Sequence, residues 1–442
     1  MCRGCRFWCM LLLTALVARK GVVAIRIRLA SSAFITSLHR QTLTIPQRKT
    51  SFMLQNTLSN SNTMSTTTTT TIPTGSTTVA TSTIATTVVT AKIVSPSQLE
   101  ECGERLRQGD LVAFPTETVY GLGCHALDPV AVQKVFDAKE RPLTDPLIVH
   151  VNHAVDALKL WQNHSDPALI ALTTTFWPGP LTIVAKAAPT VPQILMANTG
   201  FVACRSPSHT IARQLIDCAQ VPIAAPSANK FGHVSPTKSS HVWDDLHSEN
   251  VWIIDAPEGC HVGVESTVAK VSDNGHVTVL RQGAVSVEQI AACLHHAGLT
   301  NVVERNTERA VHEHVATVAP GQTIRHYSPN IPSFMIASAM CTLPLSEEDQ
   351  SALKTTIIID FGGVLQTWNQ FALAYRDLSC TGDSAVAARH VFDALRWAER
   401  IEGGSRIVFP DLPPTTGTDA LTLALKDRLT RAASGVVIDA LQ

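Results

Sequence analysis

Polar side chains that could bind a small ligand stand at the ends of several apolar segments. The segments and the residues that follow them are 111–114 with 115–123 (PTETVYGLG), 202–204 with Arg205, 223–225 with Pro-Ser-Ala-Asn at 226–229, and 277–280 with Arg281. Single cations, hydroxyls and an amide, repeated at strand ends with apolar residues behind them, are typical of a cleft for a polar ligand. Gly121 and Gly123 taken alone suit plain turns as well as a backbone that approaches a ligand closely.

Two further cations follow a predicted helix. An acidic N-cap and a proline at the first helical position, Asp128 and Pro129, predict its start, and it ends near Lys139 and Arg141. Cations at a helix C-terminus have an ordinary alternative explanation, because they complement the helix dipole and stay solvated. The next apolar segment ends on His150, which alone suits a packed or surface histidine equally well.

Alternating short strands and helices predict an α/β protein. The chain has 442 residues and is 45% hydrophobic, which is typical of more than one globular domain. We expect a main domain at 92–298, a connector rich in Gly, Pro and His at 299–332, and a smaller α/β domain at 333–442. In the smaller domain the pattern predicts strands at 355–360 and 406–409 and helices at 384–399 and 419–433.

The charge is unevenly distributed along the chain. No acidic residue precedes Glu100, whereas ten of the 35 Lys and Arg residues do, so 25 basic and 36 acidic residues remain for the rest. An acidic body is a poor non-specific binder of nucleic acid. We therefore expect no stable nucleic-acid binding and no membrane partner.

The first fifty residues contain nine Lys and Arg among apolar and hydroxyl residues and no acid, which is typical of a mitochondrial transit peptide. A secretory signal is the alternative, because 7–18 is an apolar run that is too short to span a bilayer. Residues 51–91 are rich in Thr and lack the periodicity needed to fold, which predicts a disordered linker. Initiation at Met53 or Met64 within it would give a cytoplasmic form beside the mitochondrial one.

The eleven cysteines are scattered through the chain. Only Cys2 and Cys5 have the spacing of a ligand pair, and no second pair matches them, so neither a zinc site nor a disulfide framework is indicated. We expect reduced, mostly buried thiols and no metal held by protein side chains.

Eight ordered motifs resemble the YrdC-like domain of threonylcarbamoyl-AMP synthases. They are Pro-Thr-Glu-Thr-x-Tyr-Gly-Leu-Gly at 115–123, Lys-x-Arg-Pro at 139–142, Pro-Leu-Ile-Val-His at 146–150, Trp-Pro-Gly-Pro at 177–180, Arg-Ser-Pro at 205–207, Pro-Ser-Ala-Asn at 226–229, Glu-Ser-Thr at 265–267 and Leu-Arg-x-Gly at 280–283. The similarity covers 93–296. Residues 321–329 resemble the linker of the long form of this family, and the last hundred residues resemble its C-terminal Rossmann-like domain.

The resemblance implies a fold and a reaction. The fold would be a twisted sheet with helices around a concave cleft. The reaction would join L-threonine, bicarbonate and ATP into L-threonylcarbamoyladenylate with release of pyrophosphate, for threonylcarbamoylation of the adenosine next to the tRNA anticodon. ATP would be a substrate with Mg²⁺ on its phosphates, and a tRNA threonylcarbamoyltransferase would be the downstream partner.

The resemblance also implies roles for single residues. The catalytic tetrad would be Lys139, Arg141, Ser227 and Asn229. ATP would be contacted by Arg141, Asp145, Ser227, Ser235, Arg281 and Tyr327. Threonine would be contacted by Thr116, Thr118, His150, Arg205 and Ser266. The chain has no Gly-x-x-x-x-Gly-Lys-Ser/Thr loop, so discrete side chains would have to hold the nucleotide. We expect the connector with Tyr327 to close over the cleft and keep water from the adenylate.

Two positions depart from the family pattern, and three other interpretations remain. Thr144-Asp145 replaces an acid followed by asparagine, and Phe201 stands where threonine is frequent; each would change how ATP is contacted. A carbamoyl transferase like the related domain of hydrogenase maturation proteins would bring acylphosphatase and zinc-finger modules, of which the sequence shows no motif. An RNA-binding module would suit a basic cleft but not the acidic body. A plain α/β core with internally satisfied polar groups would not require the ordered motifs.

Overall fold

The computed structural model describes residues 90–273, 275–306, 316–320, 326–412 and 419–441. The predicted transit peptide, both internal start sites and nearly all of the Thr-rich linker lie outside the described residues, as do 307–315 and 321–325 of the expected connector. Within the described ranges, no helix has both the length and the apolar character that a membrane crossing needs.

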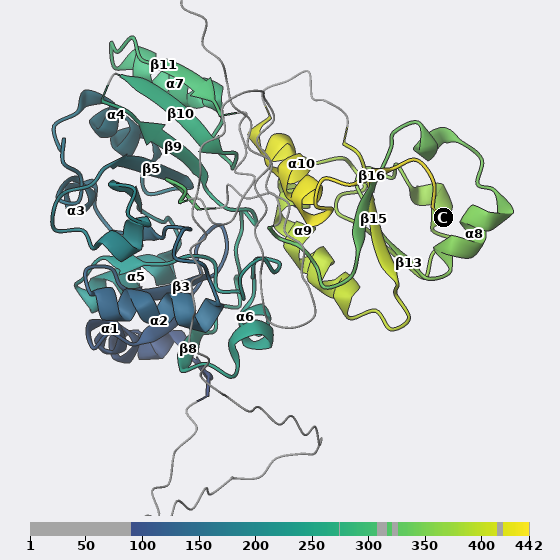
Figure 1. The fold of residues 1–442 in the computed structure, drawn as a ribbon, viewed down its shortest axis with the longest axis horizontal. Coiled ribbons are helices and arrows are strands. Elements are labelled where there is room, and N and C mark those ends of the chain that lie inside the picture. Colours follow the sequence, from purple (N-terminus) through teal and green to yellow (C-terminus); the bar gives the residue numbers. More distant parts are fainter. Residues whose placement is uncertain (1–89, 274, 307–315, 321–325, 413–418, 442) are drawn as a thin grey trace, which may run out of the picture. The chain divides into compact units, whose positions relative to one another are not determined.

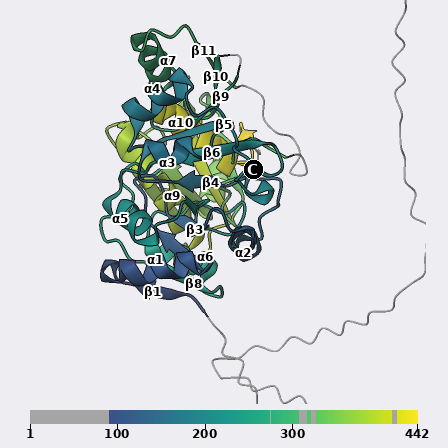
Figure 2. The same ribbon diagram turned by 90° about the vertical axis from the view of Figure 1, so that its left-hand side faces the viewer.

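The larger of two sheets has eleven strands among the described residues (Figure 1). In spatial order they are β1 (Lys92–Val94), β8 (Val251–Ile254), β2 (Leu111–Phe114), β3 (Gly121–His125), β7 (Ile223–Ala224), β4 (Ile148–His150), β6 (Phe201–Arg205), β5 (Leu181–Lys186), β9 (Thr267–Val271), β10 (His276–Arg281) and β11 (Val302–Arg305). The helices of this part are η1 (Pro96–Gln98), α1 (Leu99–Arg107), α2 (Pro129–Lys139), α3 (Ala154–Leu158), α4 (Pro167–Phe176), η2 (Gln193–Met196), α5 (Thr210–Ala219), α6 (Ser239–Leu246) and α7 (Val287–His296). In two perpendicular views α4 and α7 lie near the β9–β11 end of the sheet, and α1 and α5 lie near its β1–β8 end (Figures 1 and 2).

Local signals explain how α2 and β4 present their ends to one region. Asp128 caps α2 by accepting a hydrogen bond from the Val130 amide, as predicted, and Glu140 ends the helix in the left-handed conformation, with φ 56°. β4 pairs in parallel with β6, so His150 lies opposite Arg205. The carboxyl ends of neighbouring parallel strands meet at one edge of a sheet, where ligands bind in α/β proteins.

Of the two interpretations left open for Gly121 and Gly123, the plain turn is excluded, and the expected start of the connector is wrong. Gly121 and Gly123 are not turn residues but lie in β3, between β2 and β7. A Cβ at Gly123 would come within 2.8 Å of the Ile223 side chain, so glycine allows these strands to pack closely. The expected connector also begins with a strand, because β11 pairs in parallel with β10 and extends the sheet beyond residue 298.

In the described part of the chain the smaller sheet has five parallel strands, in the order β14 (Ala374–Asp377), β13 (Thr356–Asp360), β15 (Arg406–Pro410), β12 (Ser333–Ile336) and β16 (Val437–Ile438). Its helices are η3 (Met340–Thr342), α8 (Glu347–Leu353), η4 (Gln366–Trp368), α9 (Ser384–Glu399) and α10 (Ala420–Ala432). Side chains of Asp383 and Asp419 cap α9 and α10. The predictions of a strand at 355–360 and of both helices are confirmed to within one residue.

Helix α9 packs on a loop of the larger sheet through Gly263. This glycine has φ +81°, and a Cβ added to it would overlap the backbone of Ala388 and Arg389 in α9. Val119, Val234 and Val264 belong to the same buried apolar cluster as residues of α9 and α10. The loop that leads into β9 is therefore packed directly against the helix layer of the smaller sheet.

At the carboxyl end of β13 a glycine-rich turn is filled by two carboxylates. The amides of Phe361 and Leu365 donate to the Asp360 carboxylate at 2.7 and 2.8 Å, and the Gly363 amide donates to Asp377 at 2.8 Å. Successive backbone amides of this kind form an anion-binding nest. Here the anions are the protein's own side chains.

Candidate active site

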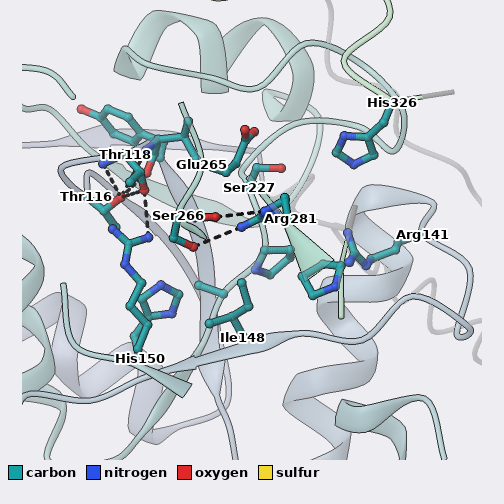
Figure 3. A pocket seen from close by; sticks show the side chains of 17 residues that line it. Thr116, Thr118, Arg141, Ile148, His150, Ser227, Glu265, Ser266, Arg281 and His326 are labelled. Atoms are coloured by element: carbon teal, nitrogen blue, oxygen red, sulfur yellow. Dashed lines mark hydrogen bonds between the residues drawn. The ribbon is translucent and has the colours of Figure 1, made fainter. Parts of the chain in front are cut away.

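A cavity opens where the strand ends of the larger sheet meet, and its empty space, counted together with the solvent at its mouth, is about 510 Å³. The residues that line it are Thr116, Thr118, Val119, Tyr120, Gly121, Arg141, Ile148, His150, Arg205, Ala225, Pro226, Ser227, Glu265, Ser266, Arg281, Pro320 and His326. Figure 3 shows the labelled side chains converging on it from β4, from β10 and from the loops between strands and helices. Eight of the residues singled out from the sequence are therefore brought together.

The two threonine hydroxyls of the cavity have their protons already directed. Thr116 Oγ1 donates to the Val119 carbonyl at 2.7 Å and lies 2.8 Å from Thr118 Oγ1. A hydroxyl has one proton, so Thr118 must donate to Thr116, and it accepts from Arg205 Nη1 at 2.8 Å. The lone pair that remains on Thr118 can accept a hydrogen bond from an amine or hydroxyl of a ligand.

Arg205 is oriented by three different groups. Besides Thr118, its Nε donates to the Gly179 carbonyl at 3.3 Å, and its Nη2 lies 2.7 Å from Glu117 Oε1 in a buried ion pair. Burial opposes the charge of Glu117, but Arg205 outweighs it and holds the pKa of that carboxyl below its ordinary value. Burial and the positive charge of Arg205 lower the pKa of His150 to about 3, so this histidine is neutral at physiological pH.

Arg281 is a buried cation that has no close counter-ion among the described residues. Its Nε and Nη2 donate to the Ser266 carbonyl and hydroxyl, each at 3.1 Å. Among the described residues no carboxylate lies within 4 Å of its guanidinium. Because an unpaired buried charge is costly, this arrangement favours an anionic ligand.

Arg141 points into the cavity from the end of α2. Its Nε and Nη2 donate to the carbonyls of Asp145 and Pro146 at 2.9 Å, and Nη2 lies 2.9 Å from the Asp145 carboxylate. Asp145, predicted to contact ATP, is thus placed beside Arg141 and is not a lining residue. The departure at Thr144-Asp145 therefore provides an aspartate that orients a cavity arginine.

Lys139 lies behind the cavity wall. Its ammonium donates to the Ser227 carbonyl at 2.6 Å and also to the Asn229 carbonyl, so it holds the Pro-Ser-Ala-Asn loop in place. Lys139 and Arg141 are only 1% and 7% exposed, which rules out the solvated helix-end explanation for both. Burial and the charge of Arg141 lower the pKa of Lys139 well below its ordinary value. Of the predicted tetrad, Arg141 and Ser227 line the cavity, whereas Lys139 and Asn229 do not.

Tyr327 does not line the cavity as its predicted contact with ATP requires. It is fully buried, and its ring centroid lies 5.4 Å from that of Phe392 in α9. Its neighbour His326 lines the cavity instead. Ser235 is also buried and donates to Glu265 Oε1 at 2.5 Å, so it meets the cavity only through that carboxylate.

Sequence reasoning missed Glu265 and His326 as lining residues. Glu265 stands in the quoted Glu-Ser-Thr motif, and His326 stands directly before Tyr327, so both were next to residues that had been singled out. Glu265 was not selected because the cleft was expected to hold anions, which a carboxylate repels. The motifs mark the right segments, but they do not tell which neighbouring side chain faces inward.

The chemistry available in the cavity is positioning and charge neutralisation. None of the described cysteines lines it, and burial raises the pKa of the Cys124, Cys204 and Cys260 thiols. In the part of the chain that the structure describes, no three His, Cys, Asp or Glu side chains are grouped to hold a metal ion. Three arginines, two threonine hydroxyls and two serine hydroxyls suit a ligand with anionic groups and hydrogen-bond donors.

Comparisons with known families cover both sheets. A family model described as telomere recombination matches residues 104–283, and one described as threonylcarbamoyl-AMP synthase, C-terminal domain, matches residues 285–434. The boundary between the two matches lies just after β10.

Individual relatives are also named threonylcarbamoyl-AMP synthase. A threonylcarbamoyl-AMP synthase of Bacillus subtilis is 34% identical over 349 residues, which cover 77% of this chain and 94% of the relative. A Pyrococcus abyssi protein with this name is 40% identical over 225 residues, which are 51% of this chain and slightly under two thirds, 64%, of the relative. A Pyrococcus abyssi crystal structure complexed with L-threonine has 30% identity and a TM-score of 0.66, covering 79% of this chain and 99% of the other.

Proposed function

The chain belongs to the threonylcarbamoyl-AMP synthase family, and from this membership we propose that it makes L-threonylcarbamoyladenylate from L-threonine, bicarbonate and ATP, with release of pyrophosphate. The observation that carries the proposal is the cavity lined by Arg141, Arg205 and Arg281 together with threonine and serine hydroxyls. Three reactants that each carry an anionic group need such a surface, and the related structure complexed with L-threonine supports threonine as one of them.

The cavity suggests where each substrate lies. Thr118 can accept a hydrogen bond from the threonine amine, while the Arg205 side of the cavity suits the threonine carboxylate. Arg141 and Arg281 suit the phosphates of ATP, since Arg281 has no carboxylate within 4 Å among the described residues. Neutral His150 adds no charge beside Arg205.

The reaction needs no protein nucleophile. Bicarbonate gives carbon dioxide, which the neutral threonine amine attacks to form a carbamate, and the hydroxide of bicarbonate leaves as water with the proton that the amine releases. A carbamate oxygen then attacks the α-phosphorus of ATP, and the bond from that phosphorus to pyrophosphate breaks. The protein holds the reactants in contact and neutralises their charge.

Mg²⁺ is proposed as a companion of ATP. Among the described lining residues Glu265 is the one carboxylate, and both of its oxygens are already engaged by Ser235 and Arg428. The side chains therefore fit a metal ion that is held mainly by phosphate oxygens and not by a protein cage. Such an ion would neutralise phosphate charge.

We also propose which enzyme uses the product and in which compartments the protein acts. Its product would pass to a tRNA threonylcarbamoyltransferase, which transfers the group to the adenosine beside the anticodon. The basic, acid-free first fifty residues support a mitochondrial form, and starts at Met53 or Met64 would give a cytoplasmic form. Mapping the N-terminal peptides of each cell fraction tests this, and only Met1 starts would contradict dual targeting.

The first experiment uses the chain beginning at Thr90, with ATP, bicarbonate and threonine, serine or valine in turn. We expect pyrophosphate and the adenylate mass only with threonine and bicarbonate, and at least a hundredfold less with Arg281→Ala. Pyrophosphate without amino-acid dependence, or none at all, would contradict the proposal. RNA binding that weakens with salt and ignores ATP would support the RNA-binding alternative.

A further inference from the structure

Glu265 is held by a residue from the other sheet's helix layer. Its Oε1 accepts from Ser235 Oγ at 2.5 Å, and its Oε2 lies 2.9 Å from Arg428 Nε, in α10. Arg428 is fully buried, also pairs with Asp427 at 2.9 Å, and lies over the Tyr327 ring, 5.2 Å from its centroid. The carboxylate that lines the cavity is thus directed toward α10.

Arg281 is close to Glu265 but not paired with it. Figure 3 shows both side chains on the same part of the cavity, and Arg281 donates twice to Ser266, the residue next to Glu265. Their ion-pair distance exceeds 4 Å, although the Glu265 charge is near enough to oppose the effect of burial on the pKa of Arg281. A released Glu265 side chain would find Arg281 as a neighbouring cation.

The backbone of Glu265 has little freedom to move. On one side Gly263 packs on α9, and on the other a Cβ at Gly283 would overlap the backbone of Glu265, Ser266 and Thr267. The direction of the carboxylate is therefore decided by its side-chain partners. A buried carboxylate that loses its cation is strongly driven to find another.

We propose that Arg428 is a positioning residue for nucleotide binding, which holds the Glu265 carboxylate away from Arg281 so that the Arg281 guanidinium stays free for an anionic group of ATP. The proposal rests on the proposed function for the identity of that anion. Without Arg428, Glu265 would pair with Arg281 and neutralise the charge that the phosphates need. The smaller domain would then contribute to the nucleotide site without touching the nucleotide.

The test measures ATP binding to the full chain by calorimetry in the absence of threonine. We expect Arg428→Met, which keeps most of the side-chain volume, to weaken ATP binding about tenfold, the effect of losing one charged contact. The decisive variant is the double substitution Arg428→Met with Glu265→Gln, which removes the competing carboxylate. We expect it to bind ATP within about twofold of the wild type. If the double variant binds no better than Arg428→Met, the role of Arg428 is only structural and the proposal is overturned.

Two further variants test whether the loss of ATP binding is specific to the pair of Arg428 and Glu265. Arg400 directly follows α9 and forms an exposed ion pair with Asp244 of α6. Arg400→Met breaks this pair, and we expect unchanged ATP binding. Glu265→Gln alone should bind ATP as tightly as the wild type or more tightly. Weakening by Glu265→Gln as large as that by Arg428→Met would mean that Glu265 contacts the nucleotide directly, which overturns the proposal.

Controls separate a loss of ATP binding from a loss of folding and from a loss of the proposed reaction. Circular dichroism and unfolding temperature check each variant, and if Arg428→Met does not fold, Arg428→Lys takes its place, with a smaller loss that Glu265→Gln should again reverse. A wild-type chain that binds ATP but releases no pyrophosphate with threonine and bicarbonate refutes the proposed function and leaves the Arg428 comparison decisive. A wild-type chain without ATP affinity overturns both.

Discussion

At the scale of the residue, the cavity is lined by arginines whose hydrogen bonds to carbonyl and hydroxyl oxygens already fix their orientation. Arg205 donates to Thr118 and Gly179 while it pairs with Glu117. Arg281 donates to Ser266 with both Nε and Nη2. Such prior orientation reduces the reorganisation that substrate binding would otherwise require.

Arg205→Lys tests whether this orientation matters for threonine. A single lysine ammonium cannot satisfy Thr118, Gly179 and Glu117 together, because only the planar guanidinium presents several donors in fixed directions. We expect the KM for threonine to rise on the order of 10- to 100-fold with a smaller change in kcat. The measurement is pyrophosphate release against threonine concentration.

Arg213→Lys is the control for that substitution. Arg213 donates to the Asn152 carbonyl and the Ser206 hydroxyl, and it does not line the cavity. Its KM should stay within about twofold of the wild type. An unchanged KM in Arg205→Lys as well would remove Arg205 from the threonine site.

The motifs predicted segments better than side-chain directions. Thr116, Arg141 and Ser227 were expected at the site and line the cavity. Lys139 lies behind the wall because its ammonium is used by two backbone carbonyls of a distant loop, a contact that no local pattern reveals. Tyr327 turns into the apolar cluster because its partners come from α9 and α10, more than sixty residues away in the sequence.

At the scale of the element, α9 is joined to the larger sheet by close backbone packing and by buried charge. Gly263 permits the close packing, while Arg396 in α9 pairs with Asp245 of α6 at 3.0 Å. His233 bridges Asp245 and Glu399 at 2.8 and 3.0 Å. The sequence predicted α9 from its periodicity, but its partners only become visible in the folded chain.

Gly263→Ala should break the packing on α9. The substituted residue would have both an unfavourable positive φ and an overlap with the α9 backbone, so we expect a loss of about 3 kcal/mol in the free energy of unfolding. Gly298→Ala is matched in φ, at +75°, but its Cβ meets nothing within 4 Å, and we expect a loss of about 1 kcal/mol. Urea denaturation compares the two, and equal losses would show that the α9 contact contributes nothing.

His233 should make stability depend on alkaline pH. Burial lowers the pKa of His233, but hydrogen bonds to Asp245 and Glu399 outweigh it and raise the pKa from 6.5 to about 9, while Arg396 opposes the charge. The folded pKa is the higher one, so the stabilisation is fully present below pH 6.5 and is lost as the pH rises through 9.

We therefore expect the free energy of unfolding of the wild type to fall by up to about 3 kcal/mol more than that of His233→Gln between roughly pH 6 and pH 10. Urea denaturation at both pH values measures this difference. Parallel losses in the two proteins would show that His233 does not carry the effect.

At the scale of the whole molecule, loops of the larger sheet that border the cavity pack against the helices of the smaller sheet. Val119, Val234 and Val264 share an apolar cluster with α9 and α10, and His326 reaches the cavity from the segment that precedes β12. The order of motifs predicted an α/β protein with two sheets, which the structure and the family comparisons confirm. The packing of these loops on the helices could not be predicted, because apolar periodicity identifies a buried face without identifying what covers it.

Ending the chain after Arg305 should therefore abolish ATP binding. The truncation exposes the three valines of the shared cluster and removes both His326 and Arg428. We expect aggregation in gel filtration and no heat of ATP binding in the soluble fraction. Starting the chain at Thr90 instead should leave ATP binding unchanged. A soluble truncated protein with wild-type affinity would show that the larger sheet alone forms the site.

The backbone amides of the glycine-rich turn after β13 are already occupied by two carboxylates. Asp360 and Asp377 occupy the amides with which a parallel sheet of this kind would otherwise receive a phosphate group. An incoming nucleotide would have to expel two like charges before it gained one hydrogen bond. The carboxylates of the smaller sheet thus keep these amides from a phosphate group, and the contacts of the smaller domain with the cavity loops come instead from α9 and α10.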